Sequence, residues 1–185
     1  MMYNTEMIRK RYNDGEVLKF VFFWGHTEKA GYIGKTCLSQ WYPCEFEVEG
    51  TRYCTAEQYM MAQKAVLFGD QEICEKIMHA GHPREYKALG RQIRNFKQNV
   101  WDQHKYEIVL KGNVAKFSQN VELKEFLLRT GQRVLVEASP YDRIWGVGIK
   151  AEDRAIQNPN NWQGENLLGF ALMEARSLIE KGDRF

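Results

Sequence analysis

The chain has 185 residues, of which 44% are hydrophobic and 27% charged. This composition is typical of one globular domain that buries about 70% of the surface of its unfolded chain, and it excludes a mainly disordered protein. The formal net charge of +2 excludes a strongly basic nucleic-acid coat. With no run of about 18 apolar residues and no signal-peptide core, we expect a cytoplasmic protein without a membrane partner.

The first part of the chain predicts a polar N-terminal extension over residues 1–16, followed by strands. The segment VLKFVFFWG (17–25) is rich in Val, Phe and Leu and ends at glycine, as a buried strand does. Farther on, CEFEVEGTRYCT (44–55) alternates apolar and polar residues around Glu49 and Gly50, which predicts a hairpin. Together they predict a small antiparallel sheet. Residues 27–44 between them predict a long loop, and loops of this length are often functional.

Helices are predicted to dominate from Thr55 onward. Glycine and proline punctuation delimits segments 55–68, 70–80, 83–92, 99–117, 120–130 and 166–181. A strand is predicted over 133–139, and a second long loop, dense in Gly, Pro, Asn and Trp, over 140–165. The pattern predicts one helix-rich α+β domain over residues 17–182.

Cysteine and histidine spacing does not indicate a metal site. The cysteines lie 7, 10 and 20 residues apart, without the close pair of a zinc site, at Cys37, Cys44, Cys54 and Cys74. We expect reduced thiols. His79 and His82 are separated by Gly81 and followed by Pro83, so they do not share a helical face. We therefore expect no metal and no cofactor.

The segment TAEQYMMAQKA (55–65) predicts a buried helix that carries charge. Thr55 and Gln58 match a capping box, so the helix begins at Thr55 and Glu57 lies in its first turn. Glu57 and Lys64 share one helical face. Two ordinary explanations stay open: the helix dipole stabilises a first-turn carboxylate, and a lysine can extend its amine to solvent. If Lys64 is buried, its pKa falls and the amine becomes a better nucleophile.

The segment SPYDRIWGVG (139–148) is a second candidate for chemistry. Asp142 can shape a turn or act as a catalytic carboxylate, and Trp145 beside Gly146 offers an aromatic face close to the backbone. Five tryptophans in one small domain could stack a base. Arg91 and Arg94 fit a phosphate, or form an ordinary solvated helix face.

Several separated motifs together resemble the NADAR family of YbiA-like N-glycosidases. They are FFWG, LSQWYPCEFEVEG, TAEQYMMAQKA, the Gly90–Arg91 pair, Trp101, YDRIWGVG and NLLGFALMEAR, in that order from about Phe22 to Arg176. The resemblance implies the YbiA-like fold, mainly helical with a small antiparallel sheet, over residues 17–182. It also implies hydrolysis of an N-glycosidic bond between a base and a phosphorylated ribose or ADP-ribose.

Site residues follow from the same resemblance. The implied catalytic residues are Glu57, Lys64 and Asp142, and the implied substrate contacts are Trp24, Ser39, Trp41, Arg91, Trp101, Trp145, Gly146 and Asn166. Two departures, Gln40 and Val147 where some relatives have Asn and Asp, leave the choice of substrate open. The candidates are the phosphoribosylamino-pyrimidine intermediates of riboflavin biosynthesis and ADP-ribosylated guanine.

The sequence is compatible with two catalytic mechanisms and with one non-catalytic function. Glu57 and Asp142 would act as acid and base, in an order that the sequence leaves open, or Lys64 would form a Schiff base with C1 of the ribose. The expected partner is a small ribosyl or ADP-ribosyl molecule, with ADP-ribosylated nucleic acid as the second candidate. The rival is a non-catalytic module that binds ADP-ribose or nucleic acid. Paired buried ionisable groups favour the enzyme. No oligomeric state is assigned.

Overall fold

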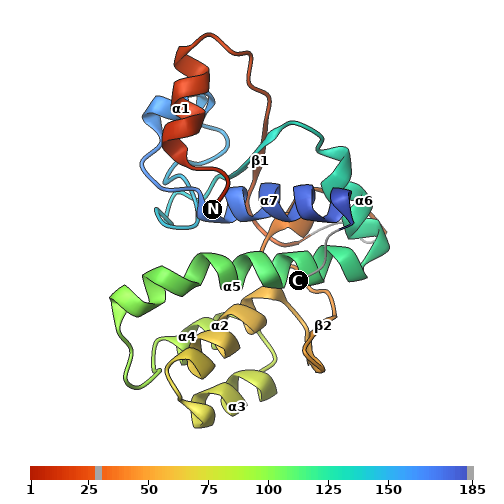
Figure 1. Cartoon of the computed structure of the whole chain (residues 1–185), viewed down its shortest axis with the longest axis vertical. Helices are drawn as coiled ribbons and strands as arrows, with labels where there is room; N and C mark the ends of the chain where they lie inside the picture. The colour runs from red at the N-terminus through yellow and green to blue at the C-terminus, as the bar shows by residue number, and fades with distance from the viewer. Residues whose placement is uncertain (28–30, 183–185) are drawn as a thin grey trace.

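A computed structural model describes residues 1–27 and 31–182 (Figure 1). Part of the predicted loop 27–44 therefore lies outside the described residues. The described helices are α1 (Thr5–Asn13), α2 (Ala56–Leu67), α3 (Gln71–His79), α4 (Pro83–Gly90), α5 (Gln98–Gln119), α6 (Val121–Arg129) and α7 (Leu167–Lys181). The strands are β1 (Phe20–Phe23), β2 (Phe46–Val48), β3 (Thr51–Tyr53) and β4 (Val134–Glu137). Short 3₁₀ helices are η1 (Lys35–Leu38), η2 (Arg154–Gln157) and η3 (Pro159–Asn161).

The predicted helices are confirmed as α2 to α7, with bounds that differ by about two residues at most. Helix α1 was not predicted, because residues 1–16 read only as a polar extension. Its ends nevertheless carry ordinary signals: the Asn4 side chain accepts a hydrogen bond from Met7 N, and Lys10 lies in the last turn. Ile8 is its buried anchor. A helix with so short an apolar face depends on the surface it covers.

The hairpin is confirmed, but β1 does not join its sheet. β2 and β3 pair antiparallel, and their turn has positive φ at Glu49 (51°) and Gly50 (78°), as hairpin turns of this length favour. β1 instead pairs in parallel with β4, so the prediction of one antiparallel sheet that includes 17–25 is wrong. Both of these strands are nearly continuous apolar runs, which is typical of parallel strands covered on two faces. The α+β class and the small antiparallel sheet stand.

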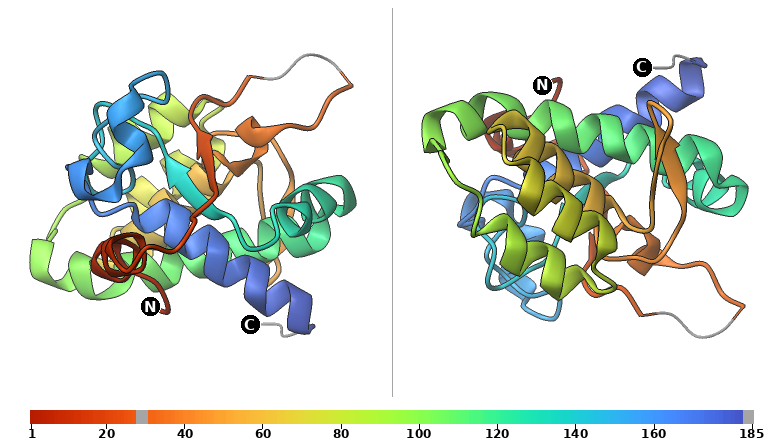
Figure 2. Two further views of the ribbon diagram at one scale, coloured as in Figure 1. Left: turned by 90° about the horizontal axis from the view of Figure 1, so that it is seen from above. Right: turned by 90° about the horizontal axis from the view of Figure 1, so that it is seen from below.

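Helix α5 runs through the middle of the molecule and organises the rest. Helices α2, α3 and α4 lie on one side of α5, and α1 and the loop 140–165 lie on its other side (Figure 1). Helix α7 crosses α5 and packs on β4 (Figure 2). The site-forming loops are therefore supported by two long helices that contact each other.

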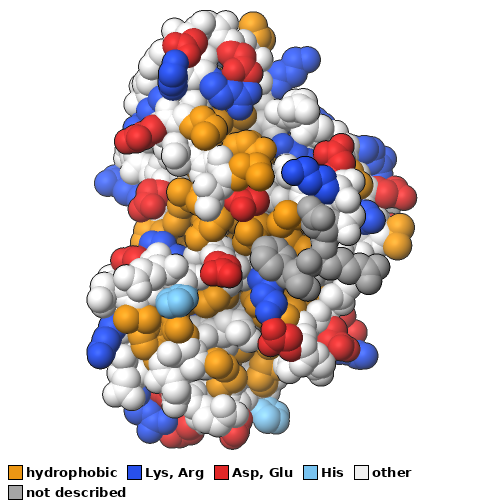
Figure 3. Space-filling view, viewed as in Figure 1, with side chains coloured by type: hydrophobic (Ala, Val, Ile, Leu, Met, Phe, Trp, Pro, Cys, Tyr) orange, Lys and Arg blue, Asp and Glu red, His pale blue; other side chains and the backbone are white. Residues whose placement is uncertain are grey.

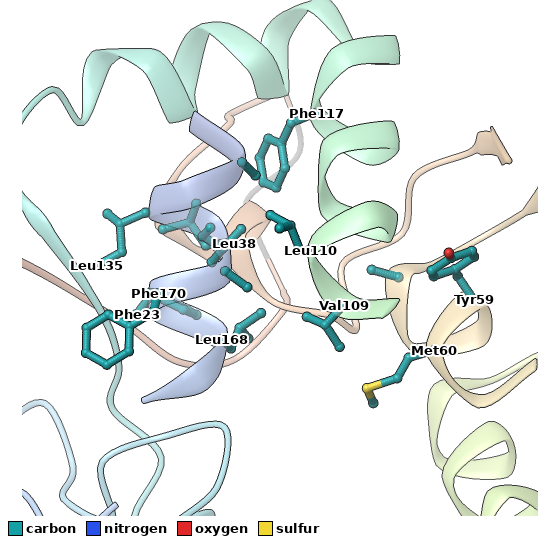
Figure 4. Close-up of a cluster of buried hydrophobic side chains, with 14 of the residues drawn as sticks. Phe23, Leu38, Tyr59, Met60, Val109, Leu110, Phe117, Leu135, Leu168 and Phe170 are labelled. Carbon is teal, nitrogen blue, oxygen red and sulfur yellow. The ribbon is translucent and has the colours of Figure 1, made fainter. Parts of the chain in front are cut away.

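The hydrophobic core joins these elements (Figure 4). Side chains from both parallel strands, α2, α5 and α7 meet there, among them Phe23, Tyr59, Val109, Leu135 and Phe170. Two glycines permit unusually close packing. A Cβ on Gly169 of α7 would lie 2.1 Å from the Leu135 carbonyl oxygen, and one on Gly112 would lie 2.4 Å from the Tyr59 ring. Helix α7 therefore rests directly on the backbone of β4.

The surface and the helix lengths agree with the composition. Acidic and basic side chains are interspersed over the face in Figure 3 rather than gathered by sign. Within residues 1–27 and 31–182, no helix combines the length and the apolar character needed to span a bilayer.

Candidate active site

The carboxyl ends of the two parallel strands lie side by side and begin the site. Phe23, the last residue of β1, lies opposite Glu137, the last residue of β4. The chain continues from these ends into Trp24 and into the loop that carries Asp142. Residues that follow adjacent parallel strands emerge at the same edge, which is where ligands commonly bind in sheets of this kind. Two segments far apart in sequence are thus brought together.

The first turn of α2 supplies Glu57, and its start is fixed as predicted. Thr55 Oγ1 accepts a hydrogen bond from Gln58 N at 3.0 Å. Gln58 Oε1 accepts from Cys54 N at 2.8 Å, one residue before the position of a regular capping box. Half of the predicted box is therefore confirmed, and the Gln58 side chain bonds one residue farther back.

Glu57 is tied to the segment before the hairpin through both its backbone and its side chain. Glu57 N donates to the Gln40 carbonyl at 2.9 Å, and the Trp41 indole N–H donates to the Glu57 carboxylate. Only 4% of the residue is exposed. Burial raises the pKa of Glu57 to about 7, against the positive charge of Lys87 and the Trp41 hydrogen bond, which lower it. The negative charge of Asp142 raises it further.

Glu137 is a second carboxylate in the same place, and sequence reasoning missed it. Burial raises its pKa to about 8, with further contributions from the charges of Asp142 and then Glu57. The residue as a whole is half-buried, but its Oε2 atom is buried and accepts no hydrogen bond from any described residue. The available signal was a lone carboxylate at the end of the apolar strand RVLVEAS.

Asp142 completes a cluster of three carboxylates. Its Oδ1 accepts hydrogen bonds from Ile144 N at 2.9 Å and Trp145 N at 2.8 Å, so the turn after Pro140 orients the side chain. Its charge acts on both glutamates. We refer to Glu57, Glu137 and Asp142 as the carboxylate cluster. Helix α2, strand β4 and the loop 140–165 contribute one member each.

The cation that faces the cluster is Lys87, in the last turn of α4, and sequence reasoning did not select it either. Its positive charge lowers the pKa of both Glu57 and Glu137. Arg84 and Arg91 lie three residues before it and four after, and all three side chains are exposed. Residues at this spacing share one side of a helix. Arg84 and Lys87 of α4 and its C-cap residue Arg91 therefore form a basic stripe, and the charge of its middle member, Lys87, acts on the cluster.

Lys64 makes a different set of contacts. Its Nζ donates to the Gly90 carbonyl at 2.9 Å and lies 4.3 Å from the centre of the Phe96 ring and 5.5 Å from that of Trp101. Burial lowers the pKa of Lys64. Lys64 and Trp101, both selected from the sequence, thus lie together beside the end of α4, whereas the charge acting on the carboxylate cluster is that of Lys87.

Aromatic side chains occur on the segments that carry the carboxylate cluster. The Trp24 ring centre lies 6.3 Å from that of Tyr141, and these residues are 53% and 87% exposed. The Trp41 ring centre lies 5.5 Å from that of His26 and 6.3 Å from that of His82. Tyr141 was not selected from the sequence, although it directly precedes Asp142. An exposed aromatic pair beside buried carboxylates is suited to a ligand with a flat ring.

Other residues selected from the sequence support the backbone of the site. Ser39 Oγ accepts from Trp41 N at 3.1 Å. A Cβ on Gly146 would lie 2.8 Å from the Glu137 carbonyl oxygen, so glycine allows the loop to approach β4. The fully buried Asn166 accepts from Glu137 N at 3.0 Å and donates to a β4 carbonyl. Direct contact of these residues with substrate stays a prediction.

Two further observations limit what the side chains can hold. Arg94, considered above for a phosphate, bonds Asp70 through its backbone N and its guanidinium, at 2.6 Å for the shortest contact. Arg91 has no ion-pair partner among the described residues. Within residues 1–27 and 31–182, no three His, Cys, Asp or Glu side chains are grouped so as to hold a metal ion.

Comparison with known proteins places this arrangement in a family. The sequence model of the NADAR domain matches residues 22–180, which contain every member of the carboxylate cluster. The chain belongs to the NADAR domain family. The solved structure of the Escherichia coli protein YbiA is similar to this NADAR chain, with a TM-score of 0.70 and 28% sequence identity over 90% of this chain and 89% of that one.

Curated relatives of this NADAR chain include named enzymes. N-glycosidase R617 of Acanthamoeba polyphaga mimivirus is 46% identical over 166 residues, covering 87% of this chain and 96% of the relative. N-glycosidase Npun_R5314 of Nostoc punctiforme is 35% identical over 143 residues, covering 77% and 85%. The chain is accordingly an enzyme of the glycosidase class, a hydrolase of N-glycosyl compounds.

Proposed function

We propose that this NADAR chain hydrolyses the N-glycosidic bond between a phosphorylated ribose, or ADP-ribose, and a nitrogenous base, with the carboxylate cluster as its acid–base machinery. The observation that carries this proposal is that Glu57 and Glu137 both have raised pKa values, that the charge of Asp142 raises both further, and that the charge of Lys87 opposes these shifts. A site that only binds its ligand needs donors and aromatic faces, whereas buried carboxylates with raised pKa values are typical of proton transfer.

The chemistry of the bond assigns the roles. As the C1–N bond breaks, positive charge develops at C1 and the departing nitrogen needs a proton. Glu57 and Glu137 have pKa values of about 7 and 8, so near neutral pH the pair retains a proton that it can donate. We assign the acid to this pair. Asp142, oriented by two backbone N–H groups, is assigned to the carboxylate that stabilises C1 or activates water.

A Schiff-base route through a lysine is the alternative mechanism for the same reaction. The amine would bond to C1 of the opened ribose as the base leaves with a proton, and water would then hydrolyse the imine and restore the amine. Lys64 is the amine proposed from the resemblance, and burial lowers its pKa, which favours a neutral nucleophile. Lys87 is the amine facing the cluster. Borohydride trapping followed by peptide mapping distinguishes the two, and absence of any adduct favours the carboxylates alone.

The remaining features match the other parts of such a substrate. The basic stripe of Arg84, Lys87 and Arg91 is suited to one or two phosphates. The Trp24–Tyr141 pair offers a stacking surface for the base, and Trp41 donates a hydrogen bond to Glu57. The two substrate candidates, a phosphoribosylamino-pyrimidine and ADP-ribosylated guanine, differ in carrying one phosphate or two.

Incubation of the purified chain with each candidate, followed by mass spectrometry, tests the proposal. We expect release of the free base from one of them. Asp142→Asn should lose this activity, whereas the matched variant Asp153→Asn should retain it. Asp153 caps a turn of the same loop by accepting from Ala155 N at 2.9 Å. Binding of both compounds without base release would overturn the proposal and favour the non-catalytic module.

A further inference from the structure

A buried lysine on α5 lies outside the proposed chemistry. We propose that Lys116, together with Asn113, is a positioning residue that holds segment 37–41 so that the Trp41 indole donates to Glu57. The kinetic part of this inference rests on the proposed function, in which Glu57 belongs to the acid pair. Its structural part concerns the Trp41–Glu57 hydrogen bond alone and can be tested without substrate.

Lys116 is fully buried and binds backbone carbonyls rather than an acid. Its Nζ donates to the Cys37 carbonyl at 2.7 Å and to the Ser39 carbonyl at 2.8 Å. The ring centres of Phe117 and Tyr42 lie 5.0 and 5.6 Å from the same atom. No described carboxylate lies within ion-pair distance of it. An apolar side chain could occupy this space without desolvating an amine, so the two carbonyl bonds are its distinguishing feature.

Asn113 lies one turn earlier on the same side of α5 and holds the next residue of the segment. Its Nδ2 donates to Gln40 Oε1 at 3.0 Å and to the Val109 carbonyl at 2.8 Å, and the residue is fully buried. Residues 37, 39 and 40 are therefore each bonded to one long helix. Side chains three apart on a helix project to the same side, so the two act as one clamp.

The clamped segment is the one that reaches the carboxylate cluster. Gln40 accepts a hydrogen bond from Glu57 N at 2.9 Å through its carbonyl, and Trp41 donates to the Glu57 carboxylate. Within the segment, Ser39 Oγ accepts from Trp41 N. The connection from Lys116 to Glu57 thus consists of hydrogen bonds and two peptide units. Releasing the clamp allows the indole to move, and a displaced donor no longer stabilises the Glu57 anion.

Another buried cation provides a matched control. Arg176 on α7 donates to Thr130 Oγ1 at 2.6 Å and to the Arg133 carbonyl at 3.1 Å, where α6 ends and β4 begins. It is buried as Lys116 is, and burial lowers the pKa of both. Arg176→Met therefore removes a buried cation and its carbonyl bond without touching segment 37–41.

The experiment is a carboxyl-carbon NMR titration of protein labelled at the glutamate side chains, with Glu57→Gln used to assign the signal. Lys116→Met and Asn113→Ala should both raise the apparent pKa of Glu57 above its wild-type value of about 7, as Trp41→Phe should. Arg176→Met should leave it unchanged. The double variant Trp41→Phe/Lys116→Met should titrate like Trp41→Phe, because both changes act through one hydrogen bond.

If Lys116→Met folds and its Glu57 has the wild-type apparent pKa, the inference is overturned. If Lys116→Met does not fold, a wild-type apparent pKa of Glu57 in Asn113→Ala overturns the inference instead. An equal shift in Arg176→Met would also decide against it, since any buried cation would then have the effect. Where base release is measurable, the basic limb of the rate profile should move with the titration and kcat should fall about 10- to 100-fold. Failure of the proposed function would remove the rate readout and leave the titration intact.

Discussion

Asp70 and Glu57 are both buried carboxylates beside α2, yet their surroundings move their pKa values in opposite directions. Asp70 accepts bonds from the backbone N and the guanidinium of Arg94 and from Ile73 N, and these hold its pKa well below its usual range. Glu57 has one indole donor, and burial raises its pKa to about 7. Burial thus creates a proton donor only where partners are few. Asp70, with several hydrogen-bond donors, belongs to the scaffold, whereas Glu57 and Glu137, which have few or none, belong to the candidate site.

The largest effect is expected when Glu57, the carboxylate with few hydrogen-bond partners, can no longer donate a proton. Glu57→Gln keeps the shape and the Trp41 contact but cannot donate a proton, so kcat should fall about 10²- to 10⁴-fold. Circular dichroism should show an unchanged fold. The matched variant Glu125→Gln, at an exposed pair with Arg129, should retain full turnover. Turnover near wild type in Glu57→Gln would remove Glu57 from the acid pair.

A substitution of Asp70, the fully hydrogen-bonded carboxylate, should affect stability rather than turnover. Asp70→Asn should lower the melting temperature by about 5–10 °C at pH 7, because Arg94 loses a charged partner. The contribution of Asp70 is present above the unfolded pKa near 3.8 and is lost as the pH falls through the depressed folded pKa, so the difference from wild type should shrink in acid. We expect little change in kcat. An equal loss in Asp14→Asn, at an exposed pair with Lys10, would deny Asp70 a special role.

The raised pKa of Glu137 predicts how the stability of the protein depends on pH. The folded state holds its proton up to a pKa of about 8, whereas the unfolded chain releases it near 4.5, so the free energy of unfolding should fall between these values. Glu137→Gln removes that decline. The variant should be more stable than wild type above pH 8, on the order of 3 kcal/mol, and similar to it near pH 4.5. Denaturant titrations at both pH values measure this, and parallel curves would contradict it.

The smallest predicted effect concerns the aromatic surface. Tyr141→Ala should raise KM about 10-fold for a substrate with a heteroaromatic base, because one stacking face is lost, while kcat changes little. Tyr141→Phe should restore the wild-type KM. Tyr12→Ala, another partly exposed tyrosine on α1, serves as the control. If Tyr141→Phe is as impaired as Tyr141→Ala, the hydroxyl rather than the ring makes the contact.

Much of this molecule was predicted from local sequence signals. Thr55 caps α2 as expected, Pro83 begins α4, and Glu49–Gly50 forms the hairpin turn. These features succeed because capping and turn bonds join residues a few positions apart. Helix α1 and the parallel pairing of β1 with β4 were missed. Their stability comes from surfaces contributed by distant parts of the chain.

The sequence by itself determined the helical α+β class and the first-turn location of Glu57, and through the family resemblance it selected Asp142 as a candidate catalytic residue. Only the tertiary structure decided that Glu137 joins them, that Lys87 rather than Lys64 carries the charge acting on the cluster, and that Lys116 binds the segment holding Trp41. The physical reason is that these contacts join residues far apart in the sequence, whereas sequence signals report on near neighbours. A carboxylate in a strand looks like any other until packing removes its water and places two more charges beside it.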